Sequence, residues 1–235
     1  MSNWEIMTVN GHEICPKANL RRADLSGVNL CQANLNCSDL RAADLSGAAL
    51  NRTNLCEARL GGANLSGAKL AGANLDRADL RNANLANANL DRADLHKAVL
   101  RNACMTNASL HMAELNGVDF AGANLSGADL DRAYLKGATL VKAILRGADL
   151  DRTFLVGAEI AGADLSEANL AGADLRHAGL SEANLVGADL HLADLSGANL
   201  VGADLHLADL SGASADSTTA WPSDFDPEAS GVVTF

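Results

Sequence analysis

Residues 185–213 read LVGADLHLADLSGANLVGADLHLADLSGA, and this stretch carries the pattern that decides the fold. Leucine recurs at every fifth position, alanine stands two residues before it, and Asp or Asn lies between them. The same register runs from Leu20 to Leu210 through 39 consecutive pentads. Only three of these positions depart from leucine: Met105, Phe120 and Ile160. A fixed short period predicts one structural unit repeated many times, so function must be sought where the pattern changes.

A period of five residues fits neither a helix nor a continuous strand. Five residues advance a helix by about 500°, so leucines at this spacing would scatter around it instead of forming an apolar stripe. In a strand, side chains alternate between two faces, so an odd spacing sends successive leucines to opposite sides. A short extended segment followed by a turn places each Ala and Leu inward and the residue between them outward.

The turn has its own signature. Of the 21 glycines, 17 stand at the second residue after the leucine, as Gly127 does in the segment 125–128. That residue is third in a four-residue turn, where a type II turn requires positive φ. Because other copies carry Arg, Lys or Glu there, a mixture of turn types is expected. Four right-angle turns close a square that consists of four pentads. Squares stacked at about 4.8 Å predict roughly ten coils and a rod of about 45–50 Å.

These residues resemble the pentapeptide repeat family, whose A(D/N)LXX motif is matched from Ala18 to Ala213. The resemblance implies an all-β fold, a right-handed quadrilateral β-helix, in agreement with the geometry above. Leucines would fill the centre and alanines would line the walls, because nothing larger fits beside them in so narrow a tube. The expected core includes Leu20, Leu25, Leu100, Met105, Phe120, Ile160 and Leu210.

A near-exact internal duplication indicates that the chain grew by small units. Residues 185–198 read LVGADLHLADLSGA, and residues 200–213 repeat this stretch. The shift is three pentads instead of the four that make up a coil, so pentads are expected to be interchangeable among the four faces.

The sequence divides into three parts: residues 1–17 as an N-terminal cap, 18–213 as the β-helix, and 214–235 as a tail expected to dock partly as a C-terminal cap. A solenoid exposes its core at both ends and needs such covers. Apolar residues flank the repeats on both sides: Trp4, Ile6, Met7, Val9 and Ile14 before them, and Trp221, Phe225, Val232, Val233 and Phe235 after them. The tail resembles the W-P-x-x-F-D-P-E…G ending of many cyanobacterial family members. A flexible tail is the alternative.

The cysteines and the N-terminus favour a reducing compartment. The five cysteines form no C-x-x-C pair, and the first residues lack the charged start and apolar run of a secretory signal. An odd number of thiols without a signal predicts a cytoplasmic protein with reduced cysteines. A disulfide between Cys37 and Cys56 is the alternative, because the square geometry brings them near each other. No apolar stretch approaches the roughly 18 residues of a membrane span, so no membrane association is expected.

The net charge of −11 is unevenly distributed along the chain. Residues 1–110 hold 12 basic and 10 acidic side chains. Residues 111–176 hold 6 basic and 10 acidic side chains, and residues 177–235 hold no basic and 9 acidic side chains. Binding of nucleic acid by a basic groove is therefore not expected. Some family members inhibit DNA gyrase by presenting a DNA-shaped acidic rod, and this role is the alternative function. It calls for negative charge along most of the rod, which the first half lacks. Solvation of the rod accounts for most outward aspartates.

The outward site before each leucine is Asp or Asn in 26 of 39 pentads, and the departures cluster between residues 99 and 159. Two of them, Tyr134 and Phe154, lie four pentads apart and are predicted to stack in adjacent coils. The candidate protein-binding patch consists of Met112, Glu114, Arg132, Tyr134, Lys136, Arg152, Phe154 and Val156. Exposed aromatic residues flanked by arginine are typical anchors of protein–protein contacts. Alternatively, the two rings only extend the stacking of their face, and Asp131 and Asp151 neutralise the arginines.

No catalytic, cofactor-binding or metal-binding residues are expected. Among the six histidines only His111 and His191 share a column, and they would lie about 19 Å apart. The motifs of serine hydrolases, phosphate-binding loops and zinc proteases do not occur. A convex rod with a packed interior also offers no substrate pocket.

The predicted function is that of a non-catalytic, cytoplasmic protein-interaction scaffold whose partner is a protein of unknown identity. The length, the nearly uninterrupted pentads and both ends resemble a cyanobacterial family member that regulates heterocyst differentiation. This resemblance implies the same role, exerted through protein contacts. A structural spacer without a specific partner is a further alternative. A monomer is expected, with a dimer as the alternative.

Overall fold

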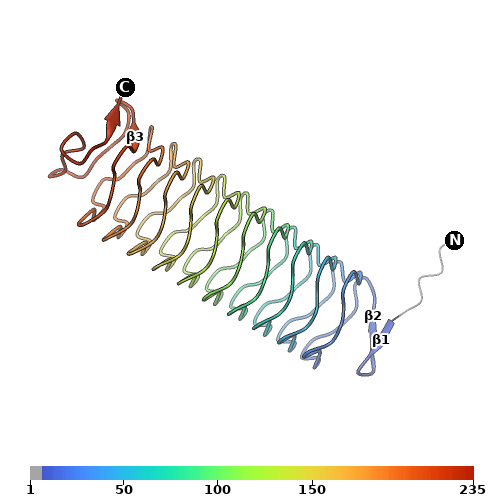
Figure 1. Ribbon diagram of the computed structural model, residues 1–235. Helices are drawn as coiled ribbons and strands as arrows, with labels where there is room; N and C mark the ends of the chain where they lie inside the picture. Colours follow the sequence, from blue (N-terminus) through green and yellow to red (C-terminus); the bar gives the residue numbers. More distant parts are fainter. Residues whose placement is uncertain (1–6) are drawn as a thin grey trace.

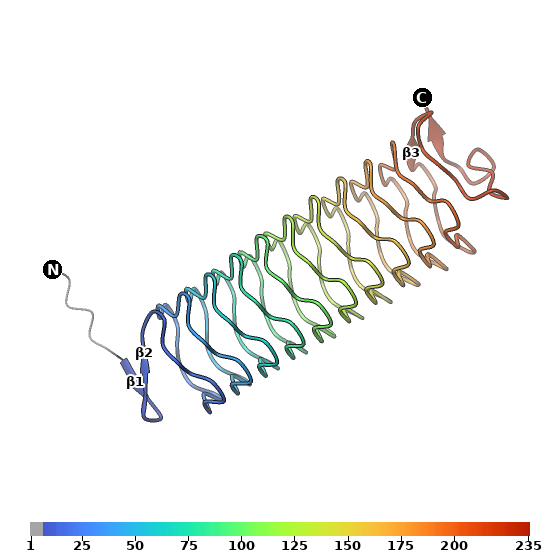
Figure 2. The same cartoon turned by 180° about the vertical axis from the view of Figure 1, so that it is seen from behind.

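The computed structural model describes residues 7–235, which form a rod of stacked coils (Figures 1 and 2). Along the rod, the residue before each leucine pairs in parallel with its counterpart four pentads later, from Asn19 with Asp39 to Asp194 with Ser214. Each coil therefore consists of four pentads and has four sides. The predicted right-handed quadrilateral β-helix is confirmed.

Each side of a coil is a short extended segment that is bonded to the coils before and after it. The N–H of Leu45 donates to the C=O of Asn64 in the next coil, and the N–H of Asn64 donates back to the C=O of Ala43, at 2.7 and 2.9 Å. The inward Ala and Leu side chains form one continuous core. Seven core positions expected from the sequence are at most 2% exposed: Leu20, Leu25, Leu100, Met105, Phe120, Ile160 and Leu210.

The turns all follow one pattern, so the expected mixture of turn types is wrong. In every pentad the second residue after the leucine has a positive φ, between 52° and 73°, whether or not it is glycine. From Arg22 to Leu192 each of these N–H groups donates to the next coil, as Arg132 does to the C=O of Asp151 at 2.9 Å. The stacking therefore holds Arg, Lys and Glu in the left-handed conformation, despite its cost of about 1–2 kcal/mol per residue.

The outward Asp and Asn side chains cap the turns. In all 26 pentads that carry Asp or Asn at this site, its Oδ1 accepts a hydrogen bond from the N–H two residues later. The bond from the Ser46 N–H to Asp44, at 2.9 Å, is typical. Short Asp and Asn side chains are suited to this contact. Solvation of the rod is therefore only part of the reason for their presence.

A hairpin precedes the first coil. Strand β1 (Met7–Val9) pairs antiparallel with β2 (His12–Ile14). The turn residues Asn10 and Gly11 have φ values of 49° and 78°, and positive φ at both positions is what a type I′ turn requires. The Asn10 side-chain amide donates to the C=O of Asp24, at 3.0 Å, and so ties the hairpin to the first coil.

The residues expected to cover the N-terminal end of the core differ in their burial. Ile14 is buried, and Val9 is partly buried against the core. Met7 is 41% exposed and contributes little cover. Trp4 and Ile6, the remaining residues of that expectation, lie outside the described residues.

At the opposite end, β3 (Ser214–Ala215) pairs in parallel with β4 (Val233–Thr234), and the tail between them folds back beside the last coil (Figure 1). The four-pentad register ends here. Asn199 pairs with Ala220, one residue beyond the position that the regular spacing gives. Ser214 then pairs with Val233, one residue before the regular position. The tail thus follows the last coil with local changes in register.

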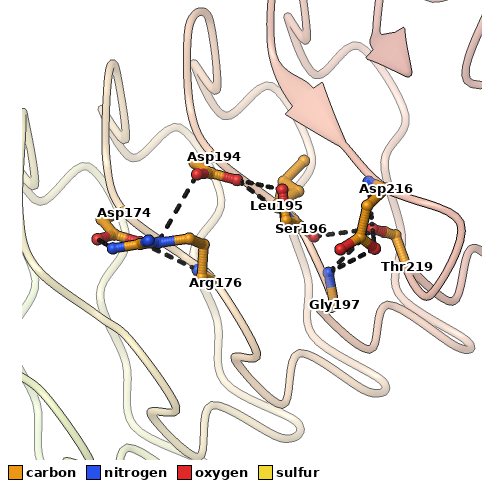
Figure 3. Close-up of polar contacts among 8 residues, drawn as sticks. All are labelled: Asp174, Arg176, Asp194, Leu195, Ser196, Gly197, Asp216 and Thr219. Atoms are coloured by element: carbon orange, nitrogen blue, oxygen red, sulfur yellow. Dashed lines mark hydrogen bonds and ion pairs between the residues drawn. The ribbon is translucent and has the colours of Figure 1, made fainter. Parts of the chain in front are cut away.

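Side chains of the tail replace part of the regular bonding between coils, as Figure 3 shows. The N–H of Gly197 donates to Oδ1 of Asp216 at 3.1 Å and to the hydroxyl of Thr219 at 3.2 Å. That hydroxyl donates in turn to the C=O of Leu195, at 3.0 Å. The tail is therefore joined to the repeats by hydrogen bonds as well as by apolar contacts.

The apolar residues of the tail divide into two groups. Val232 is buried, and Trp221 and Phe225 pack against the core with their ring centroids 5.2 Å apart. Val233 and Phe235 are instead 57% and 77% exposed. Only part of the tail's apolar surface is therefore used against the repeats.

Candidate protein-binding face

The rings of Tyr134 and Phe154 stack on one side of the rod. Their centroids are 5.0 Å apart and their planes differ by 5°. The two residues pair in parallel in adjacent coils, as their spacing predicts. Phe154 is 41% exposed and Tyr134 is partly exposed. The pair therefore presents an aromatic surface on a side of the rod that is otherwise polar.

Carboxylates bound the aromatic stack along the axis of the rod. Glu114 pairs with Tyr134 on one side, and Asp174 pairs with Phe154 on the other. Arg176 donates to both carboxylate oxygens of Asp174, at 2.7 and 2.6 Å, and lies 3.7 Å from Asp194 (Figure 3). These hydrogen bonds hold the pKa of Asp174 below its ordinary value. The stack thus ends in a charged network on the side of the C-terminus.

The corner that precedes the stack in each coil carries Met112, Arg132 and Arg152. Met112 is partly exposed and both arginines are exposed. Arg132 lies 3.7 Å from Asp131, and Arg152 lies 3.6 Å from Asp151. The neutralising contacts required by the alternative interpretation are therefore present. Exposed ion pairs of this kind contribute only about 0–1 kcal/mol, so both guanidinium groups remain available to a partner.

The corner that follows the stack carries Lys136, which is exposed, and Val156, which is partly exposed. An aromatic ring cannot accept the hydrogen bond that Asp or Asn accepts from this corner. The N–H of Lys136 donates instead to Oδ1 of Asn116 in the preceding coil, at 3.1 Å. The N–H of Val156 has no acceptor among residues 7–235. Beside the rings there is consequently a backbone N–H without an acceptor in the described part of the chain.

Four exposed apolar side chains lie outside the residues predicted from the sequence, and one of them, Val201, is 53% exposed at a first turn position. Ile144 occupies the outward site of another face and is 41% exposed. Leu192 and Leu207 are 66% and 77% exposed, with φ values of 59°, at the turn position where glycine is most frequent. Their residue type at this position was the signal that could have found them.

Little on the described surface is arranged for catalysis. Residues 7–235 contain no group of three or more His, Cys, Asp or Glu side chains placed to hold a metal ion. The five cysteines are free thiols. Burial, followed by the nearby carboxylates of Asp76 and Glu57, raises the pKa of the Cys56 thiol, which disfavours the reactive thiolate. The same residues contain no helix that is long and apolar enough to cross a membrane.

Several solved structures are similar to this chain. One of them is the crystal structure of HetL, a pentapeptide repeat protein involved in heterocyst differentiation regulation in Nostoc. The two sequences are 36% identical over an alignment that covers 77% of this chain and 88% of HetL, and the TM-score is 0.39. Another pentapeptide repeat protein from Nostoc is 39% identical over 46% of this chain and 84% of its own, with a TM-score of 0.34. QnrB1, a plasmid-mediated fluoroquinolone resistance protein, is 18% identical over 84% and 87%, with a TM-score of 0.47.

No curated protein sequence matches the chain. The model of the pentapeptide repeats matches it in eight copies that span most of its length. These copies fall within residues 17–52, 38–77, 48–85, 73–111, 113–152, 155–191 and 188–218. The four-pentad coils and the leucine core are what this repeat forms. The chain therefore belongs to the pentapeptide repeat family.

Proposed function

We propose that the protein is a non-catalytic scaffold that binds another protein through the face formed by Tyr134 and Phe154. The observation that carries this proposal is the parallel stack of the two rings, with Phe154 41% exposed. Arg132 and Arg152 lie on the preceding corner and Val156 on the following one. Aromatic and arginine side chains are enriched among the residues that contribute most to protein–protein binding.

The local structure gives a second reason to assign a role to the two rings. Every outward Asp and Asn accepts a hydrogen bond from the turn that follows it, whereas Tyr134 and Phe154 do not. A hydrogen bond of this kind contributes about 0.5–1.5 kcal/mol. Stacking of the rings stabilises the fold by a similar amount, about 0.5–1.5 kcal/mol. The net stability that the fold gains from aromatic residues at these two sites is therefore small. Binding of a partner accounts for them better than stability does.

The chemistry of the face indicates the kind of partner. An apolar or aromatic side chain would cover the exposed ring of Phe154. Carboxylate or amide oxygens would accept from Arg132 and Arg152, which donate in a planar fork. A backbone C=O of the partner would accept from the N–H of Val156. A segment with apolar and acidic residues meets all three requirements.

Two features of the sequence indicate a more specific role for the protein. The unbroken pentads and the W-P-x-x-F-D-P-E tail resemble a cyanobacterial regulator of heterocyst differentiation. We propose the same role for this chain, exerted through protein contacts in the cytoplasm. Five free thiols are compatible with a reducing compartment. We propose a monomer as the working state, with a dimer as the alternative.

The test uses a double variant, Tyr134→Asn with Phe154→Asn. Asparagine removes both rings and can restore the turn hydrogen bond, so this variant should fold at least as well as an alanine variant. The matched control is Ile144→Asn, which changes an equally exposed outward residue on another face. Affinity capture from an extract of a heterocyst-forming cyanobacterium should recover a partner with the wild type and the control.

The double variant should bind that partner about 5- to 150-fold more weakly, which corresponds to a loss of about 1–3 kcal/mol. Equal binding by wild type and double variant would exclude this face as the binding site. Failure of the wild type to capture any partner would favour the structural spacer.

Inhibition of DNA gyrase is the alternative function, and it predicts a different result. A rod that imitates DNA needs negative charge along the surface that meets a phosphate-binding partner. Here residues 177–235 carry nine acidic and no basic side chains, whereas residues 1–110 have a net charge of +2. The scaffold proposal predicts that excess protein leaves gyrase supercoiling unchanged. Inhibition that persists in the double asparagine variant would support the alternative.

A further inference from the structure

One corner of the N-terminal half carries an interrupted column of arginines. The first turn residue is arginine at four of five successive coil positions: Arg21, Arg41, Arg81 and Arg101. At the middle position stands Gly61, the only glycine at the first turn position of any of the 39 pentads. An open hollow of about 670 Å³ lies at this interruption. Its lining consists of Arg41, Arg59, Gly61, Gly62, Asp79, Arg81 and Asn82.

The backbone does not require glycine at position 61. Gly61 is not among the residues with positive φ. A Cβ atom built on it would meet its nearest neighbours, Cγ of Arg41 and the C=O of Arg81, at 3.8 Å, which is ordinary contact. Val141 occupies the same position four coils later, so the fold accepts a branched side chain there. What glycine provides at this site is open space between two arginines.

The arginines around this space are held in place. Arg41 donates through Nε and Nη2 to Asp39, and Arg81 donates through the same atoms to Asp79, at distances between 2.5 and 2.8 Å. A guanidinium has five N–H donors, so each of these two keeps three for another acceptor. Preorganised guanidinium groups lose less conformational freedom when they bind an anion.

Arg59 adds a positive charge that no carboxylate of the described residues balances, beside the two ion pairs of Arg41 and Arg81. It lies at the outward site between the coils of Asp39 and Asp79, and it is exposed. Among residues 7–235 it forms no ion pair within 4.0 Å, in contrast to Arg41 and Arg81. The hollow has three arginines in its lining, against the carboxylate of Asp79 in the lining and that of Asp39 bonded to Arg41. This is a local excess of positive charge on a protein whose net charge is −11.

We propose that the hollow at Gly61 binds an oxyanion carried by a protein chain, either a side-chain carboxylate or a phosphate ester, between the guanidinium groups of Arg41, Arg59 and Arg81. Carboxylate and phosphate oxygens are the acceptors that arginine binds in a bidentate manner. The site lies on a different side of the rod and nearer the N-terminus than the Tyr134 face, so it goes beyond the function proposed above. Each proposal can fail without the other.

The proposal is tested by calorimetric titration at low salt with four probes. These are a short aspartate-rich peptide, a phosphoserine peptide, the same peptide with unmodified serine, and inorganic phosphate. The two acidic peptides should bind, and the unmodified peptide should not. Binding by inorganic phosphate as tight as by the phosphopeptide would assign the site to a free anion and overturn its role in binding a chain.

Three variants separate the hollow from general electrostatic attraction. Arg59→Gln removes the unpaired cation, and Gly61→Val fills the space without changing the charge. Arg146→Gln is the matched control, because it removes one exposed positive charge outside the hollow. The first two variants should weaken binding of the acidic peptides by about fivefold or more, and the control by less than about twofold. Equal losses for Arg59→Gln and Arg146→Gln, or unchanged binding by Gly61→Val, would overturn the proposal.

Discussion

Arg41 binds both carboxylate oxygens of Asp39, two residues earlier in the chain. Its Nε donates to Oδ1 at 2.8 Å and its Nη2 donates to Oδ2 at 2.5 Å. This bidentate contact lowers the pKa of Asp39 to about 2, from an ordinary value of 3.8. The folded state therefore binds this proton less readily than the unfolded chain does. The stabilising contribution of the pair is present above pH 3.8 and is lost as the pH falls through about 2.

The variant Asp39→Asn should consequently be less stable than the wild type near neutral pH. The difference in melting temperature should shrink as the pH is lowered from about 4 to 2, because the wild-type carboxylate becomes protonated there. Thermal unfolding followed by circular dichroism at several pH values measures this. The double variant Asp39→Asn with Arg41→Gln serves as the control, and the pH dependence should not differ between it and the single variant. A difference between wild type and single variant that is independent of pH would contradict the assigned ion pair.

The core predicts a large difference between two leucine substitutions. Leu100 is fully buried, so Leu100→Ala should lower the free energy of unfolding by about 2–5 kcal/mol through lost burial and a residual cavity. Leu207 is 77% exposed, and Leu207→Ala should change the free energy of unfolding by no more than about 0.5 kcal/mol. Urea titration of both variants measures the two values. Similar losses would show that the leucine ladder is not the main apolar core.

The capped turns can be examined at single pentads. Asn54 accepts from the N–H of Cys56 at 3.1 Å, so Asn54→Ala should cost about 0.5–1.5 kcal/mol. Thr139 occupies an outward site that lacks this bond, and Thr139→Asn should raise stability by up to a similar amount. Chemical denaturation of the two variants beside the wild type provides the measurement. A stabilising Asn54→Ala would refute the capping role of the outward side chain.

His191 offers a titration that can be followed residue by residue. Its Nδ1 lies 2.6 Å from Oδ1 of Asp189, and this hydrogen bond raises the pKa of His191 above its ordinary value of 6.5. The stabilising contribution is therefore present below pH 6.5 and is lost as the pH rises through the raised pKa. Imidazole resonances recorded by NMR should show a lower pKa for His191 in Asp189→Asn. The weaker charge effect of Asp209 predicts a smaller decrease in Asp209→Asn, and the opposite order would disprove this account.

Much of the fold follows from the sequence because its period is strict. A spacing of four pentads was sufficient to place Tyr134 against Phe154, and the register alone was sufficient to bury positions as different as Leu100 and Phe120. Residue type alone predicts a mixture of turn types, but the structure has one turn conformation throughout. At Arg132 and similar positions, the hydrogen bonds between coils impose the left-handed backbone that glycine adopts easily. Local preference was outweighed by the periodic contacts.

Two features could not be derived in the same way. The pairing of Asn199 with Ala220 interrupts the period, and no repeat in the tail indicates where the residue is inserted. The hollow at Gly61 depends on the conformations of Arg41 and Arg81, which the spacing alone does not give. The high frequency of Asp and Asn at the outward site is the sequence signal of their capping role, although solvation of the rod explains the same frequency.

Four pentads per coil have a consequence for the way such a rod can change its length. Insertion of four pentads after Phe154 would move the C-terminal segment farther along the axis and leave its azimuth unchanged. A copy of three pentads, like the one that ends at Ala213, instead turns everything beyond it by three quarters of a revolution. Gain or loss of whole pentads can thereby place the C-terminal residues in any of four orientations about the axis relative to Tyr134. The leucine core stays in register in each of them.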